Sequence, residues 1–208
     1  MKKILALCIG LFTGLAAFAQ SAEEIMEKMD AVMDGQPMDR VAMTMEVKIP
    51  ILGTMKTRAY SFGEKERIDA VVKGITIITW SDGKTEWTYD SKDNKVEITN
   101  VKADKKEDSA SDDMEMFSNV SEGYDVSIKS QDADSWTIQC KKNKANKSKD
   151  DPKNMEIVVQ KGTFYPLSLS AKVSGTSVRI SEIAFDVTEE KVTFNPAAYP
   201  TAKIVDKR

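Results

Sequence analysis

The sequence contains no histidine and only two cysteines, Cys8 and Cys140. Histidine is the commonest general base and transition-metal ligand in proteins, so its absence removes the usual acid–base and metal chemistry. With one cysteine outside the N-terminal segment, an intramolecular disulfide and a thiolate zinc site are excluded. Phosphate-binding glycine loops and nucleophile elbows are also missing. The sequence therefore predicts no enzyme, no metal and no cofactor.

Long apolar runs are scarce as well. Residues 4–16 are apolar but too short to span a bilayer, follow Lys2 and Lys3, and precede small residues at Ala17 and Ala19. This pattern predicts a cleaved signal peptide over residues 1–19, a mature chain that starts at Gln20, and export to the periplasm. An uncleaved membrane anchor is the alternative. Loss of the two leader lysines changes the net charge from −3 to −5, which excludes non-specific nucleic-acid binding.

One amphipathic helix is expected at the start of a single domain over residues 20–208. Ser21 can cap it, Glu24 stands three residues later as in a capping box, and Gly35 and Pro37 end the run. The apolar side chains recur at helical spacing and must be buried against another element: Ile25, Met26, Met29, Val32 and Met33.

Most of the remaining chain shows the period-two alternation of antiparallel strands. Residues 41–49 alternate without exception, and turn residues such as Asp82-Gly83 separate the segments. Many short strands joined in this way predict a mainly β (α+β) fold with a strongly curved sheet. The expected strands are 41–49, 67–72, 75–80, 84–89, 94–101, 124–130, 136–141, 154–161, 167–173, 177–186 and 191–195.

Several polar groups could carry chemistry, and each has a structural explanation. The pairs Asp112-Asp113 and Asp150-Asp151 lie in polar loops, and residues 90–94 resemble an Asx turn more than a calcium loop. Residues 141–149 are rich in lysine and could contact an anionic surface, although a solvated hairpin end is the favoured interpretation. Cys140 alternates with Trp136 and Ile138, which favours a buried, inert thiol over a reactive one.

The eleven methionines are more distinctive. Thioether side chains are flexible and polarizable, so they suit surfaces that adapt to irregular apolar ligands. Filling gaps in an ordinary core is an equally good explanation. The clustered ones are Met26, Met29, Met33, Met43, Met45, Met114 and Met116.

Residues 80–90 carry a resemblance to a known family. The stretch Trp80-Ser81-Asp82-Gly83-Lys84-Thr85-Glu86-Trp87-Thr88-Tyr89-Asp90 resembles the central hairpin of the outer-membrane lipoprotein carrier (LolA) family. Residues 113–124, which end in Gly123-Tyr124, and the C-terminus from Phe194 to Arg208 are similar to the Bacteroidetes branch of that family. The resemblance runs in order over almost the whole mature chain.

This resemblance implies an unclosed barrel whose apolar cavity takes up lipoprotein acyl chains under short lid helices. The implied partners are acylated lipoproteins, an inner-membrane release complex and an outer-membrane acceptor, with the carrier acting as a monomer. The lid would comprise Ile25, Met29, Val32, Met114, Met116 and Phe117, and would contact the wall at Trp87 and Tyr89. The wall would comprise Met43, Met45, Val47, Trp80, Trp87, Tyr89, Leu167 and Leu169.

The sequence departs from the family at one position. In many carriers an Arg-Pro pair stands before the strand that precedes the Asp-Gly turn, and the arginine of this pair holds the lid. At the corresponding place this chain has Gly63-Glu64-Lys65-Glu66-Arg67. An arginine latch is therefore not assigned. Two other interpretations stay open: a lipid-sensing regulatory module of the same fold, and an interaction module whose apolar face is a closed core.

Overall fold

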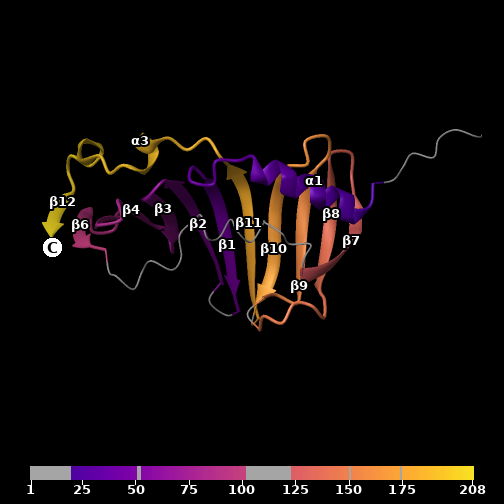
Figure 1. Ribbon diagram of the computed structural model, residues 1–208. Helices are drawn as coiled ribbons and strands as arrows, with labels where there is room; N and C mark the ends of the chain where they lie inside the picture. The colour runs from indigo at the N-terminus through magenta and orange to yellow at the C-terminus, as the bar shows by residue number, and fades with distance from the viewer. Residues whose placement is uncertain (1–19, 51–52, 102–122, 150, 174) are drawn as a thin grey trace, which may run out of the picture.

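A computed structural model describes residues 20–50, 53–101, 123–149, 151–173 and 175–208 (Figure 1). The predicted signal peptide, the Met114–Phe117 part of the lid, and the acidic residues 112, 113 and 150 lie outside the described residues. No helix among the described residues is long and apolar enough to cross a membrane.

The first element is the predicted amphipathic helix, α1 (Ala22–Asp34). The Ser21 side chain accepts a hydrogen bond from the backbone N–H of Glu24 at 3.2 Å, as expected for an N-cap. Ile25, Met26, Met29 and Met33 are fully or almost fully buried, whereas Val32 is half-buried.

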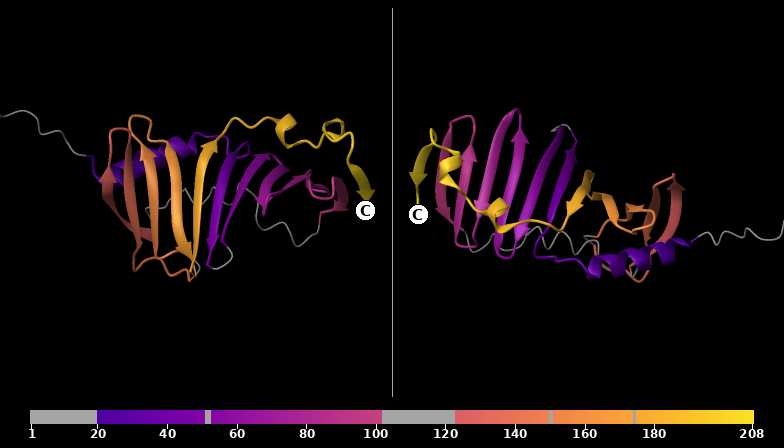
Figure 2. Two further views of the ribbon diagram at one scale, coloured as in Figure 1. Left: turned by 180° about the vertical axis from the view of Figure 1, so that it is seen from behind. Right: turned by 90° about the horizontal axis from the view of Figure 1, so that it is seen from above.

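The described strands form one open, twisted sheet with the order β12-β6-β5-β4-β3-β2-β1-β11-β10-β9-β8-β7 (Figures 1 and 2). Neighbouring strands are antiparallel except β12, which pairs with β6 in parallel. The strands are β1 (Ala42–Ile49), β2 (Gly53–Phe62), β3 (Lys65–Val72), β4 (Ile75–Ser81), β5 (Thr85–Asp90), β6 (Lys95–Asn100), β7 (Tyr124–Gln131), β8 (Ser135–Lys142), β9 (Asn154–Gln160), β10 (Pro166–Val173), β11 (Thr176–Ala184) and β12 (Lys203–Asp206).

Pairing of β1 with β11 joins two meanders, β1–β6 on one side and β7–β11 on the other. The outer strands β7 and β12 stand at opposite ends of the strand order, so the sheet does not close into a barrel. The predicted fold class, a mainly β open sheet with short helices, is confirmed.

The two faces of the sheet are covered by different segments. Strand register places Met45 opposite Ile180, and Ile180 opposite Leu169, so these side chains share one face. Helix α1 packs on this face, over the β7–β11 half, and we call it the α1 face (Figures 1 and 2). The C-terminal segment, with α3 (Glu189–Val192) and η3 (Pro196–Ala198), covers the opposite face over β2–β6, which we call the C-terminal face.

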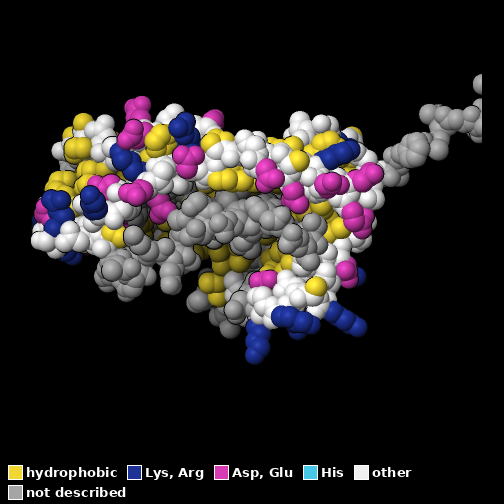
Figure 3. All heavy atoms as spheres, in the orientation of Figure 1, with side chains coloured by type: hydrophobic (Ala, Val, Ile, Leu, Met, Phe, Trp, Pro, Cys, Tyr) yellow, Lys and Arg dark blue, Asp and Glu magenta, His cyan; other side chains and the backbone are white. Residues whose placement is uncertain are grey.

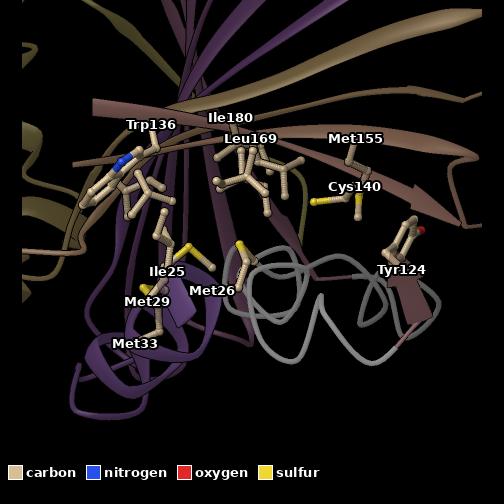
Figure 4. Close-up of a cluster of buried hydrophobic side chains, with 14 of the residues drawn as sticks. Ile25, Met26, Met29, Met33, Tyr124, Trp136, Cys140, Met155, Leu169 and Ile180 are labelled. Carbon is tan, nitrogen blue, oxygen red and sulfur yellow. The ribbon is translucent and has the colours of Figure 1, made fainter. Parts of the chain in front are cut away.

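The main core lies between α1 and the β7–β11 half of the sheet. Figure 4 shows Ile25, Met26, Met29 and Met33 facing side chains of the strands, among them Leu169 and Ile180. The strand residues of this core with 0% exposure are Met43, Ile138, Cys140, Ile157, Val159, Leu169 and Ile180. The α1 methionines therefore fill a core, which was one of the two interpretations left open.

The structure differs from the sequence predictions in three segments. Strand β2 was not predicted, and neither was β12. The strand expected at 191–195 does not form, because Glu189–Val192 is a short helix that begins after Thr188 and buries Val192.

Candidate functional site: an open apolar strip beside the core

The apolar rows of the α1 face continue past the core onto β1–β4. One row runs from Ile180 to Met45, then across β2 and β3 through Thr57 and Ala70 to Ile77. A second row pairs Val178 with Val47, and Val47 with Met55. The sequence of each strand thus places apolar side chains on this face well beyond the part of the sheet on which α1 packs.

A third row pairs Met43 with Ala59 and Ala59 with Ile68. Exposure rises sharply from the core onto β2 and β3. Ile180 is 0% exposed, whereas Met55 and Ile68 are each 42% exposed and Val72 is 39% exposed. Met45, Val47 and Ile77 are half-buried. We call this set the open strip: Met45, Val47, Met55, Ile68, Val72 and Ile77. Figure 3 shows apolar side chains on this side of the molecule, between α1 and the hairpin ends below it.

The open strip is bounded by polar side chains on β5 and β6. Thr79 of β4 pairs with Thr88 of β5, and their hydroxyl oxygens lie 3.5 Å apart. Ile77 pairs with Asp90, and Glu97 of β6 carries ion pairs to Lys95 and Lys207. The strip therefore spans β1 to β4, about 14 Å at the usual spacing of about 4.8 Å between strands.

Four of the eight predicted wall residues lie on the α1 face in the sheet's apolar rows. Met45 and Val47 lie in the open strip. Met43 and Leu169 are 0% exposed and belong to the closed core. Leu167 is 40% exposed, because a β-bulge between Pro166 and Ser168 interrupts the alternation of β10.

The prediction that Trp80, Trp87 and Tyr89 share a wall with Met43 is corrected by the register. Trp80 pairs with Arg67, Arg67 with Tyr60, and Tyr60 with Ala42, which faces away from Met43. The three aromatic residues lie on the C-terminal face. There they contact Phe194 and Tyr199, with ring centroids 4.5–5.7 Å apart, instead of α1.

Arg67 likewise lies on the C-terminal face. Its guanidinium donates to both carboxylate oxygens of Asp69, at 2.7 and 2.9 Å, and lies over the rings of Tyr60 and Trp80. It also reaches the backbone carbonyl of Lys191 at 3.5 Å. Arg67 thus contacts the C-terminal segment, and it is not an arginine that holds α1.

Arg58 and Glu182 form a second polar site on the C-terminal face, at a bulge where β11 passes β1. Glu182 has a positive φ of 53°, and its carboxylate accepts a hydrogen bond from the buried Thr44 hydroxyl at 2.5 Å. Arg58 donates to the Glu182 carbonyl at 2.6 Å. The Thr44 hydrogen bond and the positive charges of Lys56 and Arg58 hold the pKa of Glu182 below its usual value. These contacts anchor the bulge.

Two hollows in the surface are polar. One of about 440 Å³ is lined on the C-terminal face by Glu46, Glu156, Gln139, Ser170 and Arg179, among others. Another of about 480 Å³ lies between Lys65 and the α3 region. Most of the residues that line both hollows are polar or charged. No cluster of three or more metal-ligating acidic or cysteine side chains occurs within the part of the chain that the structure describes.

Sequence reasoning missed Met55, Ile68 and Val72, the most exposed members of the open strip. For Ile68 and Val72 a signal was present, because Ile68, Ala70 and Val72 occupy alternate positions of a predicted strand. For Met55 the signal was weak, because the next residues of β2 on the same face, Thr57 and Ala59, have small side chains.

No known family profile matches the chain, and no curated protein matches it. Solved structures of similar fold include a LolA superfamily protein from Nitrosomonas europaea, at 11% identity over 85% of this chain and 99% of that one, with a TM-score of 0.32. A second is the lipoprotein LppX from Mycobacterium tuberculosis, at 8% identity over 82% of this chain and 99% of that one, with a TM-score of 0.45. A third is a putative outer membrane lipoprotein-sorting protein domain from Vibrio parahaemolyticus, at 12% identity over 86% of this chain and 99% of that one, with a TM-score of 0.34. With TM-scores below 0.5, these matches carry no weight for function, which has to be argued from the site.

Proposed function

We propose that this chain is an exported carrier that binds the acyl chains of lipoproteins along the open strip and delivers them to the outer membrane. The observation that carries the proposal is the exposure of Met55, Ile68 and Val72 directly beside a fully buried core. Contiguous exposed apolar side chains mark binding surfaces in proteins that are otherwise well packed.

The energetics of acyl chains favour such a strip. Each methylene group removed from water contributes about 0.8 kcal/mol, so a lipoprotein with several chains requires a protein surface to cross an aqueous compartment. A strip that is half-exposed replaces only part of this burial. The ligand is therefore held weakly enough to be passed on, and the flexible side chains of Met45 and Met55 can adapt to it.

The partners in this proposal are acylated lipoproteins, an inner-membrane complex that releases them and an outer-membrane acceptor. The carrier acts as a monomer in the periplasm after cleavage before Gln20. An intact mass that begins at Gln20 is the expected result for protein purified from the periplasm, and a retained leader or an acylated Cys8 would contradict it.

Displacement of a fluorescent fatty acid by a lipopeptide tests the proposal directly. Ile68 and Val71 are both exposed on β3, but they face opposite sides of the sheet. Ile68→Glu introduces a charge into the open strip and should weaken fatty-acid binding at least tenfold. Val71→Glu, the matched control, should bind like wild type. Equal affinities for the two variants would overturn the proposal. Met43 is less suitable for this test, because a charge at a fully buried side chain would unfold the protein.

A further inference from the structure

The hairpin connections at one end of the sheet carry a group of exposed lysines. The end of β1 and the start of β2, the ends of β8 and β10, and the starts of β9 and β11 lie at the lower side of Figure 1, and Figure 3 shows lysine and arginine side chains projecting there. Lys48 and Lys172 line one hollow together with Asn154, which confirms that three hairpins meet at this end. We call this set the lysine surface: Lys48, Lys73, Lys144, Lys147, Lys149 and Lys172, all exposed.

In the described part of the β8–β9 connection, residues 143–149 and 151–153, several polar side chains bond inward. Asn143 accepts hydrogen bonds from the backbone N–H groups of Ala145 and Asn146, and Asn146 donates to the Asp151 carboxylate at 2.8 Å. The Tyr124 hydroxyl donates to the Pro152 carbonyl at 2.9 Å. The loop thereby keeps one acid, Asp151, in internal bonds, and presents Lys144, Lys147 and Lys149 to solvent.

Exposed apolar side chains adjoin these lysines at the neighbouring hairpins. Val71, which is 59% exposed, lies two residues before Lys73, and the exposed Val72 directly precedes Lys73 at the β3–β4 turn. Met55, 42% exposed, lies two residues into β2, next to the β1–β2 turn. Basic side chains around protruding apolar ones fit the headgroup and acyl boundary of an anionic bilayer.

The solvent side of α1, away from the lysine surface, is rich in acidic side chains. The solvent side of α1 carries Glu23, Glu24 and Glu27, all exposed, and Figure 3 shows acidic side chains along this region. The mature chain, with the net charge of −5 that follows from loss of the leader, would be repelled by an anionic membrane unless several positive charges were gathered on the side that meets it. The distribution of charge therefore defines one orientation at a membrane.

We propose that the lysine surface docks this protein on anionic phospholipid bilayers, with Val71 and its apolar neighbours entering the headgroup layer. Apolar side chains that protrude beside exposed lysines match the layered chemistry of a bilayer, with charged headgroups above acyl chains, so we take a membrane as the partner rather than an acidic protein. Docking in this orientation places the Met55 and Val72 end of the open strip next to the membrane. The docking surface itself does not depend on acyl-chain binding.

Co-sedimentation with vesicles tests the inference. The protein should bind vesicles that contain phosphatidylglycerol and remain free with pure phosphatidylcholine. Binding should be lost at about 0.5 M salt, where charges are screened beyond about 5 Å. The double variant Lys147→Glu/Lys149→Glu should lose binding at least tenfold. Its matched control, Lys28→Glu/Lys84→Glu, changes the net charge equally on α1 and in the β4–β5 turn, and should retain most of the binding.

A second pair of variants tests the apolar contribution. Val71→Glu should weaken vesicle binding severalfold, whereas Ile204→Glu, at a residue of β12 that is 49% exposed, should not. Both variants should bind fatty acid like wild type, so failure of this inference is distinguishable from failure of the carrier proposal. The inference would be overturned if the protein bound phosphatidylcholine vesicles as well as those with phosphatidylglycerol, or if a variant and its control lost the same amount of binding. It would also be overturned if the protein bound no vesicles at all. The last outcome would leave an acidic protein as the partner to seek.

Discussion

Trp87 and Phe194 stack on the C-terminal face of the sheet, with ring centroids 5.7 Å apart and planes 16° apart. Phe194 also meets Trp80 edge-on at 5.3 Å, and Tyr199 continues the stack at 6.1 Å from Phe194. This cluster fastens the C-terminal segment over β4 and β5. Trp80 and Trp87 are thus packed under this segment, on the face opposite α1.

Replacing Phe194 with alanine should therefore loosen the C-terminal segment. Aromatic pairs contribute about 0.5–1.5 kcal/mol each beyond area burial, so the loss of two indole partners should lower the free energy of unfolding by about 1–3 kcal/mol. Urea unfolding followed by tryptophan fluorescence measures this, and the native emission should shift to the red. Lys203→Ala, at an exposed residue of the same segment, is the control. Equal stability of the two variants would contradict the prediction.

Met29 of α1 tests whether this helix is core or a movable lid. Its side chain is 0% exposed, and truncation of a buried methionine to alanine costs about 2–5 kcal/mol. We expect Met29→Ala to lower the free energy of unfolding by that amount. The exposed Glu27→Ala should stay within about 0.5 kcal/mol of wild type. A Met29→Ala protein of unchanged stability with altered fatty-acid binding would instead assign α1 a gating role.

The helix and most strands could be predicted because their periodicity is strong. Ser21 and the spacing from Ile25 to Met33 define α1, and strict alternation defines β1. Strand β2 escaped prediction because its α1-face positions Thr57 and Ala59 are small, while Lys56 and Arg58 face the other side. Strand β12 has only four residues, too few to show a period.

The site was harder to predict than the fold. Alternation divides each strand into two faces, but it does not show which face of one strand continues which face of the next. That relation follows from register, and without β2 the register between β1 and β4 could not be counted. Trp80 and Met43 were consequently assigned to one wall, although they lie on opposite faces.

Cys140 should be unreactive in the folded protein. Its side chain is 0% exposed, and burial raises the pKa of the thiol to about 11. At pH 7 the thiolate fraction is then about one in ten thousand, and the thiolate is the reactive form. Iodoacetamide treatment followed by peptide mapping should leave the Cys140 peptide unmodified in the native state and alkylate it fully in denaturant. Rapid native modification would show that the core around Cys140 opens readily.

The ion pairs of Glu97 make the attachment of β12 dependent on pH. Its carboxylate accepts hydrogen bonds from Lys207 at 2.8 Å and from Lys95 at 2.7 Å, and these hold its pKa at about 2, below the usual 4.5. Because the folded state binds this proton less readily than the unfolded state, the stabilisation is fully present above pH 4.5. It is lost as the pH falls from about 4.5 to about 2.

Glu97→Gln should accordingly destabilise the protein near neutral pH and have little effect near pH 2. The neutral amide cannot pair with two lysines, and Lys207 directly follows β12, so the C-terminal strand should detach from β6 more readily. Urea unfolding of wild type and variant from pH 7 to pH 2 should show two stability curves that converge between about pH 4.5 and pH 2.

Glu27→Gln, at an exposed acid of α1, is the control and should give a stability curve that runs close to that of wild type at every pH. Added salt should narrow the gap at pH 7, because the pairs of Glu97 lie at the surface. A gap that stays constant down to pH 2 would mean that Glu97 stabilises the edge of the sheet by packing and not by charge.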